Sequence, residues 1–270
     1  LEYGTKCLSS KMEAELLLCF ILNTSIEKII VNQELRIKNQ EWKRFKELVK
    51  KRAQNYPIAY LTGHKEFYGI DFYVNKNVLV PRPETELLVE NVIELCDPKD
   101  PKCRKGPENP TILEIGTGSG CIALTLAKYL PDAKITAVDI SEKALTVARK
   151  NKRIVGARLT PVQSGQPQGL PLRNIKFRKS NLLSNIKSLP NIIVANLPYL
   201  TRDELQEPSI AHEPRLALYG GKDGLELYEK LFKQIDNRIR NQELRIKNII
   251  VFLEIGEKQG KEITKLIKKH

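Results

Sequence analysis

Residues 111–121 read TILEIGTGSGC, and this stretch decides the fold. A run of apolar and β-branched residues ends in three closely spaced glycines, and an apolar helical pattern begins at Cys121. Glycines let the backbone turn sharply and let a ligand approach its N–H groups closely. Asp139 ends the next apolar run, 19 residues after Gly120, where a carboxylate can accept hydrogen bonds from the hydroxyls of a ribose. The order of strand, glycine loop, helix, strand and aspartate therefore predicts a nucleoside-binding site.

Alternating strands and helices continue from residue 111 toward the end of the chain. The predicted strands are Thr111–Ile115, Lys134–Ile140, Ile175–Arg178, Asn191–Ala195 and Ile249–Ile255. The predicted helices are Cys121–Leu130, Ser141–Arg153 and Gly224–Ile235. Such alternation is typical of a doubly wound, mainly parallel sheet, so the predicted fold class is α/β.

The chain before residue 97 has a different pattern. Residues 11–55 carry apolar side chains at helical spacing, which predicts helices. Residues 66–80 change to alternating aromatic and β-branched side chains, which predicts a β-hairpin. Pro81 and Pro83 then interrupt the backbone, and Glu84–Leu95 has the pattern of a helix with proline near its start.

Two stretches predict loops, and one octapeptide is repeated. Residues 97–110 hold four prolines and many charges, and residues 156–174 are rich in Gly, Pro and Gln. The octapeptide NQELRIKN occurs at 32–39 and again at 241–248. Two copies so far apart do not make a solenoid, so we interpret them as an inserted surface element.

The glycine pattern bears on the kind of cofactor. The dinucleotide fingerprint G-x-G-x-x-G would need a third glycine at position 121, where this chain has Cys121. The pattern present is G-x-G-x-G preceded by Glu114, which resembles class I methyltransferases that bind S-adenosylmethionine. A nicotinamide cofactor is the alternative. The predicted cofactor contacts here are Gly116, Thr117, Gly118, Ser119, Gly120 and Asp139.

The fourth predicted strand ends in Asn196-Leu197-Pro198-Tyr199. Ligands in open α/β sheets bind beyond the C-terminal ends of the strands, so this tetrapeptide should lie beside the cofactor loop. The Asn196 side-chain oxygen and the Leu197 backbone carbonyl can each accept one N–H of an amino group, and Pro198 stiffens the turn. Tyr199 offers a flat face for a planar acceptor. A plain turn after a strand is the alternative interpretation, because Asn and Pro are common turn formers.

Several segments resemble one family, the release factor glutamine N5-methyltransferases, also called the PrmC or HemK family. The segments that carry the resemblance, in chain order, are 57–69, Val80–Glu90, Glu114–Gly120, Val138–Ser141, Asn196–Tyr199, Glu213–Gly224 and Leu253–Gly256. Together they cover most of residues 11–265. The segments Val80–Glu90 and Glu213–Gly224 are specific to that family, whereas the glycine loop is shared by many methyltransferases.

The resemblance implies both a fold and an activity. The implied fold is a small helical N-terminal domain at 1–65, a β-hairpin linker at 66–80 and a Rossmann-like S-adenosylmethionine-dependent methyltransferase domain at 81–270. The implied activity is methylation of the glutamine side-chain nitrogen in the Gly-Gly-Gln motif of class-1 peptide chain release factors, which would be the protein partner. The implied site adds Ile140, Asn181, Leu182 and also Asn196 for the cofactor, Asn196 to Tyr199 for the glutamine, and Pro81, Arg82, Pro83 and Glu84 for the pocket wall. A surface or interdomain salt bridge is the alternative role for Arg82.

The sequence departs from the family pattern in four places. Leu197 stands where the family usually has proline, Asn181 where it commonly has aspartate, and the Pro-Gly-Gly turn before the fifth strand is absent. The family's last strand pair would lie beyond His270. Asn-Leu-Pro-Tyr also occurs in ribosomal RNA adenine methyltransferases, which are the alternative function. A binding module that keeps the fold without turnover is a third possibility.

Composition sets wider bounds. The net charge is +13, but Lys and Arg are scattered along the whole chain, so we do not expect nucleic acid as a partner. No apolar run is long enough to span a bilayer, and no signal peptide is evident, so we expect a cytoplasmic protein. We also expect the protein to be a monomer. The three histidines lie far apart and no Cys-x-x-Cys pair occurs, so we expect no metal site.

Overall fold

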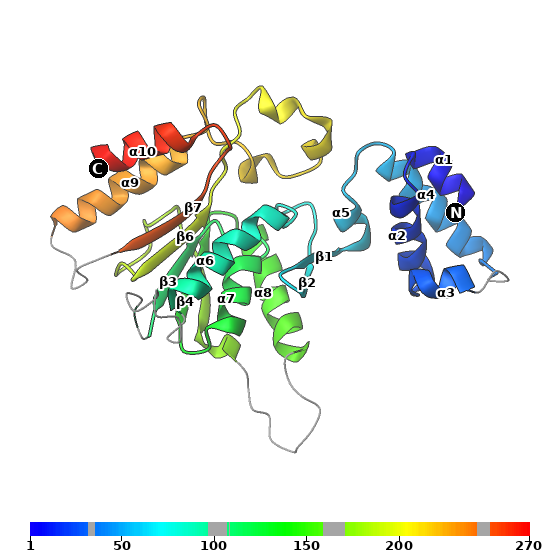
Figure 1. The fold of residues 1–270 in the computed structure, drawn as a ribbon, viewed down its shortest axis with the longest axis horizontal. Helices are drawn as coiled ribbons and strands as arrows, with labels where there is room; N and C mark the ends of the chain where they lie inside the picture. The colour runs from blue at the N-terminus through cyan, green and yellow to red at the C-terminus, as the bar shows by residue number, and fades with distance from the viewer. Residues whose placement is uncertain (32–35, 97–106, 108, 159–170, 242–248) are drawn as a thin grey trace, which may run out of the picture. The chain divides into compact units, whose positions relative to one another are not determined.

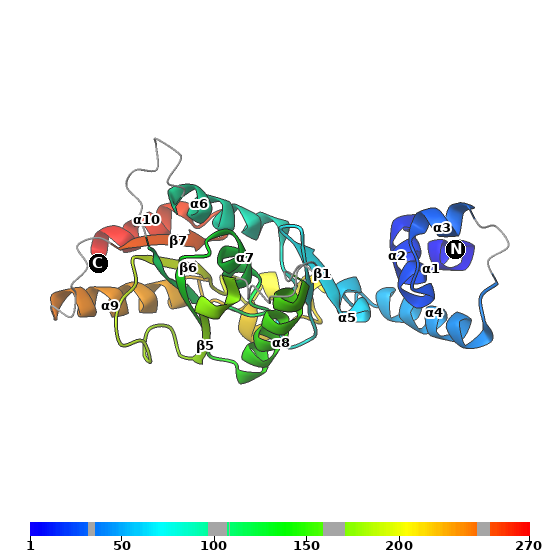
Figure 2. The same ribbon diagram turned by 90° about the horizontal axis from the view of Figure 1, so that it is seen from below.

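A computed structural model describes residues 1–31, 36–96, 107, 109–158, 171–241 and 249–270. The chain divides into two compact units (Figures 1 and 2). Unit 1 comprises Leu1–His64 and Gln206–His212, and unit 2 comprises Lys65–Leu205 and Glu213–His270. Half of the first NQELRIKN copy (32–35), nearly all of the second (242–248) and most of the two predicted loops lie outside the described residues.

Unit 1 is helical, as expected from residues 11–55. Its helices are α1 (Glu2–Leu8), α2 (Lys11–Leu22), α3 (Ile26–Val31), α4 (Asn39–Arg52) and α5 (Ile58–Thr62). The sequence pattern did not predict α1 and α5. The core is formed by α2 and α4, where Leu17, Phe45 and Val49 are fully buried. The Arg52 guanidinium donates two hydrogen bonds, of 2.9 and 2.7 Å, to the Glu13 carboxylate and so joins the two helices.

Residues Gln206–His212 belong to unit 1, although the sequence placed them in the second domain. The His212 ring lies 4.9 Å from the Tyr56 ring, centroid to centroid. The His212 Nε2 atom also lies 2.9 Å from the backbone oxygen of Gln54. These contacts reach the end of α4 from a segment far away in sequence, so no local pattern could have shown them.

The predicted hairpin at 66–80 is wrong in its extent. The two strands are β1 (His64–Phe67) and β2 (Ile70–Tyr73), and residues 74–80 form no strand. The Asn75 side chain accepts the backbone N–H of Asn77 at 3.0 Å, and the Asn75 carbonyl accepts that of Val78 at 3.1 Å. This turn redirects the chain, while its alternating valines are buried as they would be in a strand.

Unit 2 contains a parallel sheet in the order β5-β4-β3-β6-β7. The strands are β3 (Thr111–Ile115), β4 (Lys134–Asp139), β5 (Ile175–Lys179), β6 (Ile192–Asn196) and β7 (Ile250–Glu254). Every bound lies within one residue of its prediction, which confirms the α/β fold class. The order places the carboxyl ends of β3, β4 and β6 next to one another.

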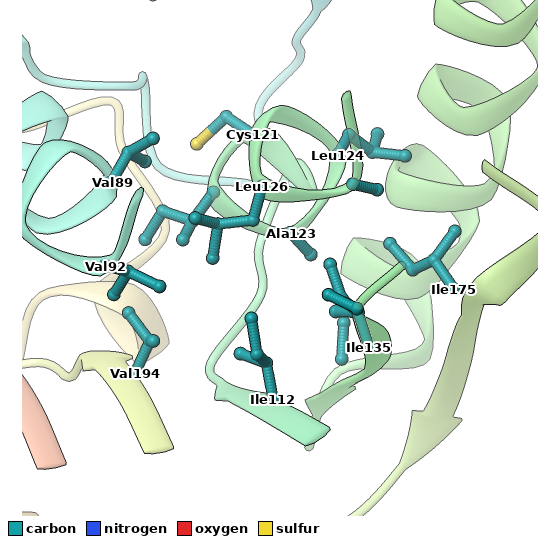
Figure 3. Close-up of a cluster of buried hydrophobic side chains, with 14 of the residues drawn as sticks. Val89, Val92, Ile112, Cys121, Ala123, Leu124, Leu126, Ile135, Ile175 and Val194 are labelled. Atoms are coloured by element: carbon teal, nitrogen blue, oxygen red, sulfur yellow. The ribbon is translucent and has the colours of Figure 1, made fainter. Parts of the chain in front are cut away.

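Helices pack on both faces of this sheet (Figures 1 and 2). They are α6 (Glu86–Cys96), α7 (Cys121–Tyr129) and α8 (Glu142–Arg158) on one face, and α9 (Glu226–Arg240) and α10 (Gly260–Lys269) on the other. Successive strand residues point to opposite faces. Ile112 and Val194 therefore pack with α6 and α7 (Figure 3), whereas Leu113 packs with α9.

Several predicted helix and loop bounds differ from the structure. The helix predicted at Glu84–Leu95 is a 3₁₀ turn, η1 (Pro83–Thr85), followed by α6. Helix α8 continues to Arg158, into the loop predicted at 156–174, because Val155 is buried against the core. The end of that same stretch, Pro171–Asn174, forms a second 3₁₀ turn, η3. Helix α9 also runs past its predicted end, where Arg238 donates to the Leu183 carbonyl at 2.8 Å.

No helix within the described ranges is both long and apolar enough to cross a membrane. Those same ranges contain no cluster of three or more His, Cys, Asp or Glu side chains that could hold a metal ion.

Candidate active site

Unit 2 has a cavity of about 380 Å³ at the carboxyl ends of β3, β4 and β6. Ligands of open α/β sheets bind at this edge, and the volume lies in the range of small-molecule sites. The predicted site residues that line it are Pro81, Arg82, Gly116, Thr117, Gly118, Ser119, Asp139, Ile140, Asn181, Leu182, Asn196, Leu197 and Pro198. Thus five separate segments of the sequence meet around one cavity.

The glycine loop is shaped by backbone hydrogen bonds to β4. The N–H groups of Gly116 and Thr117 both donate to the Val138 carbonyl, at 2.8 and 3.0 Å. Gly116 has φ +76°, a conformation that favours glycine. A Cβ atom there would lie 3.6 Å from the Asn196 carbonyl, so its absence leaves space between the loop and the end of β6.

Gly120 does not line the cavity, although the sequence placed it among the cofactor contacts. It has φ +82° and directly precedes α7. A Cβ atom there would lie 3.2 Å from side-chain atoms of both Ala148 and Leu124. The third glycine of the pattern therefore allows α7 and α8 to pack closely.

Asp139 closes the floor of the cavity at the end of β4. Its two carboxylate oxygens accept the backbone N–H groups of Gly118 at 2.9 Å and of Ser141 at 2.8 Å. Burial raises the pKa of Asp139, and these backbone hydrogen bonds oppose the rise. Each carboxylate oxygen can accept more than one hydrogen bond, so Asp139 keeps capacity for a ligand.

Glu114 is a further residue of the site. From the sequence it was known only as the residue that precedes the G-x-G-x-G pattern, and it had no assigned role. It is fully buried at the cavity, and its Oε2 accepts the Thr117 hydroxyl at 2.6 Å and the Ala123 N–H at 3.2 Å. Burial raises the pKa of Glu114 to about 8. Its other oxygen, Oε1, has no hydrogen-bond partner among the described residues. The signal for this residue was an acidic side chain inside an otherwise apolar strand.

Asn196 is the last residue of β6, and its side-chain amide is hydrogen-bonded to a residue of another segment. Its Nδ2 donates to the Thr85 hydroxyl oxygen at 3.1 Å. No described residue donates to its Oδ1 atom. The Glu254 carboxyl is a further neighbour: burial raises its pKa, and hydrogen bonding with Thr85 and Asn196 opposes the rise. Thr85 and Glu254 lie in the segments Val80–Glu90 and Leu253–Gly256, which carry the family resemblance, but neither residue was assigned a role from the sequence.

The tetrapeptide after β6 is packed between glycines and α9. Gly220 and Gly224 lie against its backbone: an added Cβ would come within 2.5 Å of the Pro198 oxygen at the first and 2.1 Å of the Tyr199 oxygen at the second. The buried Tyr228 hydroxyl lies 3.3 Å from the Leu197 carbonyl and 2.6 Å from that of Glu254. A hydroxyl has one proton, so the shorter contact is the stronger one. The Leu197 carbonyl oxygen can accept two hydrogen bonds and so keeps capacity for a ligand.

Three other predicted residues also lie outside the cavity lining. Tyr199 is half-buried, and its backbone oxygen accepts from the Gln259 amide at 3.1 Å. Pro83 and Glu84 are exposed in η1. Arg82, in contrast, does line the cavity and also forms an ion pair with the buried Glu213 carboxylate. Arg82 therefore lines the cavity as expected, and its salt bridge is with a buried residue of the same unit instead of the surface or interdomain one considered from the sequence.

Two family models match the sequence of this chain. The PrmC N-terminal domain matches residues 1–63, and a methyltransferase domain matches residues 112–184. Among solved structures, the hMettl16 catalytic domain in complex with MAT2A 3'UTR hairpin 6 is similar, with a TM-score of 0.52 over 87% of this chain and 74% of that chain. Its sequence identity of 16% supports the shared fold alone.

Curated relatives match almost the whole chain. The release factor glutamine methyltransferase of Moorella thermoacetica is 40% identical over 258 residues, which are 95% of this chain and 82% of the relative. The protein of the same name from Koribacter versatilis is 39% identical over 232 residues, 84% of this chain and 74% of the relative. The motifs that meet at the cavity are those on which the resemblance was first based. The chain therefore belongs to the family of release factor glutamine methyltransferases.

Proposed function

We propose that this chain transfers a methyl group from S-adenosylmethionine to the side-chain nitrogen of the glutamine in the Gly-Gly-Gln motif of a class-1 release factor. One observation carries the proposal: Asn196 lines the same cavity as the glycine loop, its Nδ2 is hydrogen-bonded to Thr85, and no hydrogen bond to its Oδ1 is found among the described residues. The ribosomal RNA alternative has the tetrapeptide and the +13 net charge in its favour, whereas relatives matched over most of the chain are named as glutamine methyltransferases.

The residues at the cavity fit the proposed cofactor. Asp139 offers spare acceptor capacity for ribose hydroxyls, and the Glu114 carboxyl adds a buried polar atom at the cavity, Oε1, that has no partner among the described residues. The space beside Gly116 that a Cβ would enter separates the loop from Asn196. When bound, S-adenosylmethionine supplies a methyl group on a positively charged sulfur.

Asn196 and Leu197 would orient the acceptor. The Asn196 Oδ1 and the Leu197 carbonyl accept the two N–H bonds of the glutamine amide, which fixes the direction of the nitrogen lone pair. As the nitrogen gains positive charge, both oxygens stabilise it electrostatically in a site already arranged for that purpose. As the new nitrogen–carbon bond forms, the methyl–sulfur bond breaks and its electron pair stays on the sulfur, which becomes a neutral thioether. The nitrogen is left with one proton too many, and this acidic proton passes to water.

A methylation assay with two acceptors tests the proposal. The chain is incubated with radiolabelled S-adenosylmethionine and either a class-1 release factor or ribosomal RNA. We expect label in the release factor, and none when its Gly-Gly-Gln glutamine is replaced by glutamate. Label that appears only in RNA would contradict the proposal. Cofactor binding without label in either acceptor would support a binding module instead. The cytoplasmic location and the monomeric state stay predictions.

A further inference from the structure

Three segments that are far apart in the sequence bring the side chains of Thr85, Asn196 and Glu254 close together. Thr85 is the last residue of η1, Asn196 the last of β6, and Glu254 the last of β7. Asn196 and Glu254 are also direct register partners on neighbouring parallel strands. Thr85 is almost completely buried, and its hydroxyl oxygen accepts from Asn196 Nδ2 at 3.1 Å. The three side chains therefore form one contact group.

The orientation of the Asn196 amide decides whether the site can accept a hydrogen bond. The two ends of an amide have nearly the same shape but opposite hydrogen-bonding roles. With Oδ1 toward the cavity the side chain accepts an N–H. With Nδ2 toward the cavity it would present two N–H bonds to an NH₂ group. A threonine hydroxyl alone cannot select between these orientations, because it rotates and can donate or accept.

Glu254 can make that selection. An ionised carboxylate only accepts hydrogen bonds, and Glu254 interacts with both Thr85 and Asn196. Its Oε2 atom is buried and has no hydrogen-bond partner among the described residues, so this oxygen can accept a hydrogen bond. If Thr85 gives its single proton to this carboxylate, its oxygen can only accept from Asn196. The turned amide would then place Oδ1 against an oxygen that has no proton to give.

We propose that Thr85 and Glu254 are positioning residues that hold the Asn196 amide with its oxygen toward the acceptor nitrogen. The proposal rests on the proposed function, since it assigns the Asn196 oxygen to the glutamine amide. It goes further because it gives a role in the reaction to Thr85, which lines the cavity, and to Glu254, which is not among the lining residues, through their action on the Asn196 amide.

Substitutions of Thr85 and Glu254 test the proposal through kcat. Thr85→Val keeps the shape and removes the hydroxyl, whereas Thr85→Ser keeps the hydroxyl. Glu254→Gln keeps the shape of the side chain and adds an N–H donor, so the side chain no longer favours one orientation of the Asn196 amide. We expect kcat for release-factor methylation to fall about 10-fold or more in Thr85→Val and in Glu254→Gln, with the cofactor Kd unchanged. Thr85→Ser should restore a rate near that of the wild type.

Thr125 provides the matched control. It is a fully buried threonine in α7 that does not line the cavity, and its hydroxyl has no partner among the described residues. Thr125→Val should leave kcat unchanged. The double variant Thr85→Val/Glu254→Gln should be no slower than the slower single variant, because the two residues act as a unit. Additive losses, or a wild-type kcat in Thr85→Val, would overturn the proposal.

A second measurement does not depend on the acceptor. Nuclear magnetic resonance can follow the exchange with water of the Asn196 side-chain NH₂ protons, assigned by their loss in Asn196→Ala. We expect slow exchange in the wild type and in Thr85→Ser, and fast exchange in Thr85→Val. If the wild type methylates no release factor, the proposed function fails, yet this exchange still reports on how the amide is held. Equal exchange rates in all variants would overturn the positioning role. If Thr85→Val does not fold, Glu254→Gln carries both measurements.

Discussion

The Arg82 guanidinium is paired with the Glu213 carboxylate, whose other oxygen accepts the backbone N–H of Val80 at 2.9 Å. Glu213 is buried, whereas 36% of the Arg82 side chain is exposed. The pair joins the two segments, Val80–Glu90 and Glu213–Gly224, that most specifically carry the family resemblance. It therefore fixes two walls of the cavity relative to each other, and Arg82 acts on the site through Glu213 as well as by lining it.

Arg82→Ala should destabilise unit 2, because among the described residues it leaves the buried Glu213 carboxylate with the Val80 N–H alone. Loss of a partner from a buried pair costs about 3–5 kcal/mol, and the exposure of Arg82 reduces the expected loss to about 1–3 kcal/mol. Urea unfolding measures this change. Arg149→Ala is the control: it breaks an ion pair with Glu142 that is exposed on both sides, so it should cost less than about 1 kcal/mol. Equal losses in the two variants would contradict the role of the buried pair.

Asn196→Ala should lower kcat for release-factor methylation about 10²-fold or more, because one preorganised acceptor is lost from the transition state. The cofactor Kd should stay nearly unchanged, since Asp139 and the glycine loop remain in place. Steady-state kinetics and calorimetry give the two values. Asn91→Ala, which removes an exposed asparagine of α6, should change neither. Turnover of Asn196→Ala near the wild-type rate would remove the proposed role of Asn196.

The sequence predicted the sheet well because its strands are short, apolar and separated by clear helical patterns. It also predicted that the glycine loop, Asp139 and Asn196 would meet, because the carboxyl ends of parallel strands share one edge. The hairpin was predicted too long, since buried valines at 74, 78 and 80 alternate as in a strand although an Asn75 turn bends the chain. That bend is part of the site: Lys76, Asn77 and Val78 line the cavity.

Thr85, Glu254 and Tyr228 could not be assigned from the sequence. Each acts on Asn196 or Leu197 from a segment that is distant in the chain, and such contacts depend on the tertiary fold alone. For Glu254 a signal existed but was weak: β6 and β7 are neighbouring parallel strands, and both end in a polar residue. Pro83, Glu84 and Tyr199 were placed in the site by resemblance to a motif, but adjacency in sequence does not make a side chain face the cavity.

Asp139→Ala should weaken cofactor binding. The substitution removes the proposed ribose acceptor and also frees the N–H groups of Gly118 and Ser141. Loss of such hydrogen bonds to a charged group costs about 1.5–3 kcal/mol, equivalent to a Kd raised about 10- to 150-fold. Calorimetry with S-adenosylmethionine measures the change. Asp132→Ala, at an exposed position after α7, should bind as the wild type does. An unchanged Kd in Asp139→Ala would place the nucleoside elsewhere.

Gly224→Ala should disturb the acceptor turn. The added Cβ would come 2.1 Å from the Tyr199 oxygen, and φ at this position is +74°, so both the contact and the backbone oppose it. We expect a loss of more than about 1 kcal/mol in unfolding free energy together with a lower kcat. Gly260→Ala is the matched control, because a Cβ at the start of α10 meets nothing within 4 Å. That variant should be as stable as the wild type or slightly more stable. The prediction fails if the two variants behave alike.

The buried Glu114 should make stability depend on pH. Burial raises its pKa from 4.5 to about 8, so between these values the folded protein keeps a proton that the unfolded chain releases. The folded state then binds more protons, and the unfolding free energy falls as pH rises through this window, by a few kcal/mol in order of magnitude.

Glu114→Gln keeps the shape and cannot ionise, so its unfolding free energy should lose this part of the pH dependence. Urea unfolding of both proteins at several pH values from about 5 to about 8 measures the difference. Glu90→Gln, at an exposed position of α6, should follow the wild-type curve. If Glu114→Gln and the wild type lose stability in parallel across the window, another group is responsible and Glu114 is ionised in the folded protein.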